Sequence, residues 1–204
     1  MNWKRKSENN WELLGMKSEW DVVPLRSLIS FISKGISPVY AKDKTKTTVQ
    51  VLNQKCNRNF QISYSESKLH DISKKGVPPE KYIKQNDILI NSTGTGTAGR
   101  VAQIDYVPCE TIVDGHMIIV RANKKINQRY LGYALKAHQG EILQLDEGST
   151  GQTELNRERL VEEIMISYPK SFDIQEKIVS LLDGLNSKIQ LNNKINDNLC
   201  ASDM

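Results

Sequence analysis

The chain carries the stretch DIQEKIVSLLDGLNSKIQLNNKINDNL between Asp173 and Leu199. Its apolar residues recur at steps of three and four, which is typical of an amphipathic helix with a coiled-coil-like seam. Asp173 as N-cap and Glu176 three residues later have the spacing of a capping box. The stretch therefore predicts one long helix. The apolar positions are Ile174, Ile178, Leu181, Leu185, Ile189, Ile195 and Leu199.

The length of this helix bears on what it packs against. About 26 residues at ~1.5 Å each span ~39 Å, which is longer than a domain of this size needs. One alternative is a terminal helix packed on its own core. We predict instead that it pairs with a second copy, with Asn192 on the seam as a polar residue that fixes the register. The predicted pairing residues are Ile178, Leu181, Leu185, Ile189, Asn192 and Ile195.

The 204 residues are enough for one domain with an appended helix. We divide the chain into an N-terminal extension over 1–18, a globular domain over 19–170 and the helix over 171–204. The segment Gly148-Ser149-Thr150-Gly151-Gln152 is interpreted as the hinge region between domain and helix. Many short strand-like runs mixed with a few helices predict the α+β class.

Local patterns predict the elements of the globular domain. Pro24 at a first helical position, followed by an apolar face and then by Gly35, predicts a helix. Asn127 is a candidate N-cap for a helix that runs to about Leu145. Turn residues separate the strand-like runs. These runs are Thr48–Leu52, Phe60–Tyr64, Asp87–Asn91, Arg100–Ile104 and His116–Arg121.

Charge is distributed unevenly along the chain, although the net charge is only +4. From Lys34 to Lys75 there are nine basic and three acidic residues. From Glu141 to Asp197 there are six basic and eleven acidic residues. A basic front and an acidic back indicate a polyanion partner on one side, the alternative being ordinary solvated surface charge.

The segment Gly94-Thr95-Gly96-Thr97-Ala98-Gly99 matches G-x-G-x-x-G after a strand-like run. A dinucleotide site needs a helix next, whereas residues 100–104 alternate like a second strand, so we expect a wide hairpin. The glycines then serve either a turn that needs positive φ or the approach of a phosphate beside Arg100. A nucleotide-binding enzyme is a further alternative, and it requires that a nucleotide stabilise the fold.

The sequence shows no group of residues suited to catalysis or to metal binding. Its three cysteines, Cys56, Cys109 and Cys200, contain no C-x-x-C, and its histidines fall at no metal-ligand spacing. The Asn-Pro-Pro-aromatic signature of amino-methylating DNA enzymes is absent. Polar residues follow the first Met, so we expect no signal peptide or membrane span and assign the chain to the cytoplasm. We therefore interpret it as a binding module without catalytic residues, metal ligands or a cofactor of its own.

Four stretches stand in an order that is typical of one protein family. They are Trp20-Asp21-Val22-Val23-Pro24-Leu25, Lys34-Gly35-Ile36-Ser37-Pro38, a gDiLi…G…Grva pattern over residues 86–102, and a P…eQ…I…L…lD pattern over residues 169–183. A segment from Gly148 to Leu155 precedes the last of them. Together they resemble the specificity subunit of type I DNA restriction-modification systems.

Members of that family usually carry two recognition domains and two such helices, whereas this sequence has one of each. The resemblance implies a half-length form that works as a homodimer and reads a bipartite palindrome in double-stranded DNA. It also implies that the chemistry resides elsewhere. An adenine-N6 methyltransferase subunit binds S-adenosylmethionine, and full complexes add an ATP-driven restriction subunit. The alternative function is a non-catalytic coiled-coil adaptor that binds protein or RNA.

We expect the residues that contact DNA to lie in the basic front and in the glycine loop. Lysines suit phosphate contacts, and the amide and guanidinium groups after residue 52 suit base edges. Three lysines alternate with other residues between 42 and 46, so an extended segment would put them on one side. The predicted DNA-binding residues are Lys34, Tyr40, Lys42, Lys44, Lys46, Asn57, Arg58, Thr95, Thr97 and Arg100.

Overall fold

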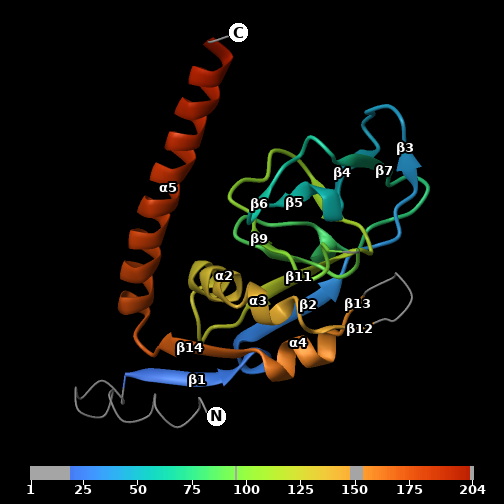
Figure 1. Cartoon of the computed structure of the whole chain (residues 1–204). Coiled ribbons are helices and arrows are strands. Elements are labelled where there is room, and N and C mark those ends of the chain that lie inside the picture. The colour runs from blue at the N-terminus through green and yellow to red at the C-terminus, as the bar shows by residue number, and fades with distance from the viewer. Residues whose placement is uncertain (1–18, 95, 148–153, 203–204) are drawn as a thin grey trace.

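A four-stranded sheet lies at the centre of the globular domain (Figure 1). The computed structural model describes residues 19–94, 96–147 and 154–202. Neighbouring strands of this sheet are antiparallel, in the order β2–β11–β8–β9. The strands are β2 Ile29–Lys34, β11 Met117–Ala122, β8 Ile88–Asn91 and β9 Val101–Gln103.

The inner strands of this sheet are buried on both faces. Side chains alternate between the two faces of a strand, so Ile88 and Ile90 of β8 lie on one face and Leu89 on the other. Ile88 and Ile90 belong to the core cluster that contains the helices, whereas Leu89 clusters with Leu52 of a second sheet. Two-sided burial explains why this strand is continuously apolar.

The second sheet also has four strands, in the order β10–β4–β7–β3, and it carries the basic front of the sequence. The β10–β4 pair is parallel and the other two pairs are antiparallel. A short hairpin, β5–β6, follows β4 in the chain and lies against β9 of the central sheet (Figure 1). The strands are β3 Tyr40–Ala41, β4 Thr48–Leu52, β5 Asn57–Arg58, β6 Gln61–Ile62, β7 Lys68–Asp71 and β10 Thr111–Val113.

Helices cover the other face of the central sheet. Asn127 caps α2, as predicted, by accepting hydrogen bonds from the backbone amides of Arg129 and Tyr130. The predicted continuous helix to Leu145 is wrong, because the chain breaks at His138, where ψ is 4°. The helices of the domain are α2 Gln128–Ala137, α3 Gln139–Ile142 and α4 Arg157–Glu163.

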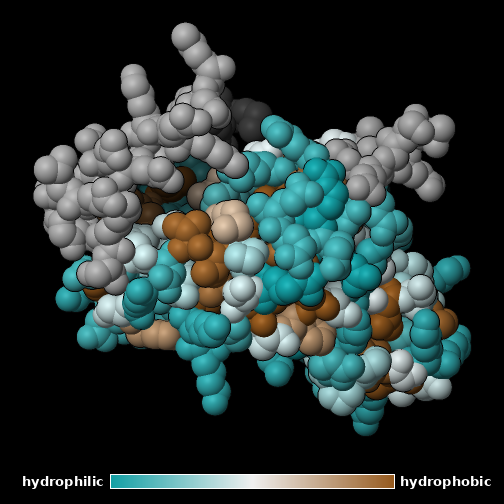
Figure 2. All heavy atoms as spheres, turned by 90° about the horizontal axis from the view of Figure 1, so that it is seen from below, coloured by the Kyte–Doolittle hydropathy of each residue, from teal (hydrophilic) through white to brown (hydrophobic). Residues whose placement is uncertain are grey.

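The two ends of the domain pair with each other at its base. Strand β1 (Trp20–Pro24) runs antiparallel to β14 (Met165–Pro169), with Trp20 opposite Pro169. Helix α5 (Phe172–Ser202) follows β14 directly and rises beside the domain (Figure 1). Figure 2 views the molecule from this base, where apolar patches are interrupted by hydrophilic residues. A two-residue pair, β12 (Asp146–Glu147) with β13 (Glu154–Leu155), completes the strands that the structure describes.

The α+β class is confirmed, but two further local predictions are wrong. The segment after Pro24 forms only a 3-10 turn over Leu25–Leu28, because the β-branched residues that follow pair with β11. The long helix begins at Phe172, so Asp173 lies in its first turn and not at the N-cap. A carboxylate there still interacts favourably with the helix dipole. The predicted hinge at 148–152 lies outside the described residues.

Gly35 marks the point where the chain leaves the central sheet for the second one. Its amide donates a hydrogen bond to the carbonyl oxygen of Met117 over 2.9 Å. A Cβ at this position would lie 2.1 Å from the carbonyl oxygen of Val113 and 2.2 Å from that of Asp114. Both obstacles are backbone atoms, which cannot rotate away as a side chain can. Only glycine therefore fits this crossing between the sheets.

We predict that Gly35→Ala destabilises the domain, because the added methyl group forces strands of both sheets apart. Overpacking of this kind costs about 1–3 kcal/mol or more. Gly76→Ala is the matched control, since a Cβ there meets nothing within 4 Å. Urea unfolding of the three proteins measures the difference. Equal stability of the two variants would contradict the crossing described above.

Candidate nucleic-acid interface and helix junction

The edge of the second sheet gathers most of the predicted phosphate-binding residues. Tyr40 of β3 is exposed, and the Nζ of Lys68 lies 4.6 Å from the centroid of its ring. Lys42, Lys44 and Lys46 are exposed in the loop that joins β3 to β4. We call these five residues the basic edge. Together they present four positive charges and one aromatic ring to solvent. Tyr40 and Lys68 lie on the adjacent strands β3 and β7, and the other three lysines lie in the loop.

The loop of the basic edge is not the extended segment that we predicted. It bends at 42–43 and turns at 46–47. Thr48 closes the turn, because its amide donates to the carbonyl oxygen of Thr45 over 3.3 Å while its hydroxyl accepts from the Thr45 amide over 2.9 Å. The lysines are therefore displayed around a turn, and not along one side of a strand.

A second group of predicted residues surrounds an open hollow between the β5–β6 hairpin and the glycine loop. Arg58, Thr97 and Arg100 line it together with Phe60 and Gln139. Phe60 turns the hairpin with a positive φ of 62°. We call this site the arginine hollow. Two guanidinium groups beside a hairpin tip offer donors for phosphate or for base edges.

Backbone carbonyl oxygens hold both guanidinium groups of the arginine hollow. The Nη2 of Arg100 donates to Gly96 over 3.0 Å, and the Nε of Arg58 donates to Lys55 over 3.3 Å. Thr97 folds back into its own loop, since its hydroxyl donates to the Gly94 carbonyl oxygen over 3.2 Å. Thr95 lies outside the described residues. The remaining guanidinium donors are the groups available to a ligand.

The glycine loop is a hairpin connection, as predicted. It joins β8 to β9, which pair antiparallel from Ile88 opposite Gln103 to Ile90 opposite Val101. A dinucleotide fingerprint requires the loop to open a helix whose N-terminus holds the phosphates. The loop therefore does not form that site.

Two predicted DNA-binding residues serve the fold. Asn57 is fully buried, and its Nδ2 donates to the Oδ1 of Asn91 over 3.2 Å and to the carbonyl oxygen of Arg100 over 2.9 Å. Its amide is engaged by the fold at the wall of the arginine hollow, so its contact with DNA stays a prediction. Lys34 ends β2 in an ion pair with Glu154, which offsets its charge. Both contacts are made with residues that are distant in the chain, and the local spacing of the sequence does not reveal such contacts.

A buried ion pair explains the aspartate of the gDiLi pattern. Asp87 accepts two hydrogen bonds from Arg121 of β11, at 2.8 Å and 2.7 Å. Asp87 also accepts from the amide of Lys84 over 2.8 Å, and this closes the turn before β8. Asn86 stands where the pattern has glycine, and its φ of 68° is one that asparagine tolerates. This cluster builds the scaffold under the candidate interface.

Gln175 joins three elements at the base of α5. Its side chain is fully buried. The Nε2 donates to the carbonyl oxygen of Pro169, which ends β14, over 2.7 Å. The Oε1 accepts from the backbone amide of Asn127, the N-cap of α2, over 2.7 Å. The glutamine of the P…eQ pattern therefore ties the long helix to both the base strand and α2.

Most of the predicted pairing residues face away from the chain's own domain. Leu181, Leu185 and Ile189 are 66%, 51% and 58% exposed. Ile195 and Asn192 are exposed as well. Ile178 is an exception, because it packs partly against the core. The alternative of a helix packed on its own core therefore holds only for the first turns of α5.

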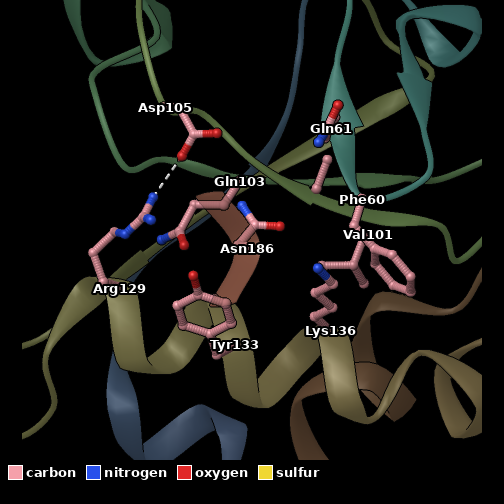
Figure 3. Close-up of a pocket in the computed structure, with 11 residues that line it drawn as sticks. Phe60, Gln61, Val101, Gln103, Asp105, Arg129, Tyr133, Lys136 and Asn186 are labelled. Carbon is pink, nitrogen blue, oxygen red and sulfur yellow. Dashed lines mark hydrogen bonds and ion pairs between the residues drawn. The ribbon is translucent and has the colours of Figure 1, made fainter. Parts of the chain in front are cut away.

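The described residues include no group of three or more His, Cys, Asp or Glu side chains placed to hold a metal ion. Within the same part of the chain, no helix combines the length and apolarity needed to cross a membrane. The hollow of Figure 3 lies between α2, β9 and the β5–β6 hairpin, and it has a volume of about 30 Å³. Small-molecule sites begin at roughly 300 Å³, so this hollow does not accommodate a nucleotide.

Comparison with known proteins identifies the family. The model of the type I restriction modification DNA specificity domain matches residues 17–201. The chain belongs to this family. The matching family is described as a DNA specificity domain. No curated protein matches the chain.

Solved structures share the fold of this specificity domain. The S subunit of a type I restriction-modification system from M. genitalium is 18% identical, with a TM-score of 0.53 over 97% of this chain and 47% of its own. The HsdS subunit from Thermoanaerobacter tengcongensis is 13% identical, with a TM-score of 0.55 over 85% and 38%.

A third structure, which concerns complex assembly and conformational transition of the type I R-M system, is 15% identical, with a TM-score of 0.59 over 85% of this chain and 40% of its own. The chain thus spans less than half the length of each of these three proteins.

We predict that Gln175→Glu loosens the helix junction at neutral pH. A carboxylate still accepts from Asn127 but cannot donate to Pro169, and an unsatisfied buried group costs about 1–3 kcal/mol. The protonated form can donate, so folding raises the pKa of the introduced carboxyl group. The variant is then closest to the parent at acidic pH and loses stability as the pH rises through that raised pKa.

Urea unfolding at several pH values measures this effect. Glu176→Gln is the control, because Glu176 is exposed and its substitution should leave stability nearly unchanged. A Gln175→Glu variant as stable as the control at neutral pH would rule out that the two hydrogen bonds of Gln175 stabilise the junction.

Proposed function

We propose that this chain is the DNA sequence-recognition subunit of a type I restriction-modification complex. The family match over residues 17–201 carries the proposal. The basic edge and the arginine hollow support it, because phosphate contacts position a protein on DNA and Arg side chains read base edges. Both sites lie on short loops over a doubly buried sheet, so their side chains can vary without loss of the core.

We further propose that two copies pair through the seam of α5. The observation that favours pairing is the row of exposed apolar side chains at Leu181, Leu185 and Ile189. An isolated row of this kind is costly in water and is buried when two helices meet. Asn192 on the same row would set the register. A two-fold pair reads two half-sites that are inverted repeats of each other.

The helix sets the separation of the two half-sites in this proposal. The part of α5 from Asp173 to Leu199 spans ~39 Å, which at ~3.4 Å per base pair corresponds to about eleven base pairs, or roughly one turn of DNA. Two recognition domains then meet the same face of the duplex in successive grooves. This chain contributes binding and geometry. An adenine-N6 methyltransferase subunit contributes the S-adenosylmethionine chemistry, and an ATP-driven restriction subunit is a further candidate partner.

Methylation in vitro tests the whole proposal. The purified chain, combined with an adenine-N6 methyltransferase subunit of a type I system from the same organism, should methylate adenine in a bipartite palindrome. Neither protein alone should do so. Absence of adenine methylation in every duplex of a random library would refute the function. Binding that unrelated DNA or RNA competes away equally well would favour the adaptor alternative.

We predict that replacing Lys42, Lys44 and Lys46 by Gln weakens DNA binding and flattens its salt dependence. Each lost phosphate contact removes about 0.9 from the slope of log K against log salt, so the slope should fall by about 2–3. Gel-shift titrations at several salt concentrations measure it. A control triple variant replaces the exposed Lys124, Lys125 and Lys177, which removes the same charge far from the basic edge. Equal slopes in both variants would place the phosphate contacts elsewhere.

We also predict that Leu185→Glu dissociates the pair, because it buries an unpaired charge on the seam. A buried, uncompensated charge costs about 3–5 kcal/mol, which raises the dimer Kd more than about a hundredfold. Ser187→Glu is the control, since two residues further along a helix point to a different side. Sedimentation velocity reports the mass of each protein. A Leu185→Glu variant that stays dimeric would move the contact away from this seam.

A further inference from the structure

Helix α5 is held to its own domain at two levels. The lower level is Gln175, which is bonded to the end of β14 and to the cap of α2. The upper level is Asp183, eight positions later and therefore about 12 Å further along the helix. Because α5 makes its close contacts with α2 and β14, its direction depends on these two levels.

At the upper level a single carboxylate receives two donors from α2. The Oδ1 of Asp183 accepts hydrogen bonds from the Nη2 of Arg129 and from the hydroxyl of Tyr133. Arg129 is held in turn by Asp105, whose Oδ1 lies 2.6 Å from its Nη1 (Figure 3). Arg129 thus lies between two aspartates. It joins the loop after β9, which carries Asp105, to α2 and α5.

This cluster lies at the margin of the domain, with the side chains of Asp183 and Asp105 38% and 56% exposed. Arg129 is partly buried, with its side chain 21% exposed, and its guanidinium lies 5.7 Å from the centroid of the Tyr133 ring. Burial, with the bond to Asp183, raises the pKa of Tyr133 to about 12. Its hydroxyl therefore remains a donor throughout the physiological pH range.

Beyond Asp183 the helix faces its domain across polar side chains. Gln190, Asn193 and Lys194 line an open cleft opposite Gln61 and Tyr106. Ile62, Tyr64 and Ile104 also line the domain side of this cleft, but the helix side is polar and the cleft is open. The two sides therefore pack little against each other and contribute little to the direction of the helix. The apolar side chains of this half lie exposed instead. The cluster at Asp183 is therefore the last firm contact before the helix leaves the domain.

We propose that Asp183, Arg129 and Tyr133 form a latch that sets the tilt of α5, and thereby the spacing of the two half-sites that a pair of chains accepts. The inference rests on the proposed function. Its physical basis is leverage. A tilt of about 10° at Gln175 moves the far end of a helix of ~40 Å by about 7 Å, which is two base-pair rises. A latch two turns above the pivot suppresses this tilt, so the three residues position the domain without touching DNA.

The tilt is measured by the distance between two spin labels in one chain. Lys84→Cys on the domain and Lys188→Cys on α5 provide the labels, in a background with Cys109→Ser and Cys200→Ser. Dilution with unlabelled protein leaves only distances within a chain. The parent should give one narrow distribution. Asp183→Asn, which weakens the latch, should shift or broaden it by several ångström, and Tyr133→Phe should do so to a smaller extent.

Glu176→Gln is the matched control, because it removes one negative charge from an exposed position of the same helix. It should leave the distribution unchanged. An Asp183→Asn distribution that is identical to the control's would overturn the latch. This measurement needs no DNA, so it decides on the latch whether or not the proposed function holds.

Spacing is then measured with duplexes that carry two selected half-sites separated by stepwise spacers. The parent should prefer one spacer, and Asp183→Asn should bind the neighbouring spacers with comparable affinity while its half-site preference stays the same. An unchanged spacer preference in a variant with a broadened distance would overturn the link between tilt and spacing. A parent that selects no half-site at all would instead overturn the proposed function.

Discussion

The buried side chain of Gln175 is the constraint on which the arrangement depends. A buried amide must find partners for both its donor and its acceptor, and here each partner is a backbone group at the end of another element. The carbonyl oxygen of Pro169 belongs to β14 and the amide of Asn127 to the cap of α2. The first turn of α5 is therefore held in place by the end of β14 and by the N-cap of α2. The start of α5 therefore has a defined place relative to the domain, and its direction depends also on the contacts of Asp183 further along.

Local pattern was enough to predict the elements whose stability is local. The cap at Asn127, the hairpin around the glycine loop and the long amphipathic helix all follow from residues within a few positions of one another. The segment after Pro24 shows where this reasoning fails. Its apolar spacing suits a helix, yet pairing with β11, some ninety residues later, makes it a strand. The family resemblance came from the order of short motifs, which survives such errors because it does not depend on secondary structure.

The candidate site was only partly predictable for a related reason. A run of lysines is visible in the sequence, and the structure places three of them in one exposed loop. Asn57 has the right chemistry for a base edge, but a partner 34 positions away takes it into the interior. The pair of Asp87 and Arg121 is equally invisible to spacing, since nothing local distinguishes a structural carboxylate from a solvated one. Contacts across the sheets thus decide which polar residues remain available to a ligand.

The pairing of β1 with β14 has a consequence for inheritance. The chain enters and leaves the globular domain through two neighbouring strands, with Trp20 opposite Pro169. The segment between them contains both four-stranded sheets, and α5 is joined to it through Gln175 at the base and through Asp183 about two turns further along. A recombination event with one breakpoint in each strand would exchange the whole intervening module at once. The new flanking segments would have to complete the same hydrophobic core, because Ile166 of β14 and Val179 of α5 belong to it. Such an exchange would move the basic edge and the arginine hollow together, as one unit with the sheets that carry them.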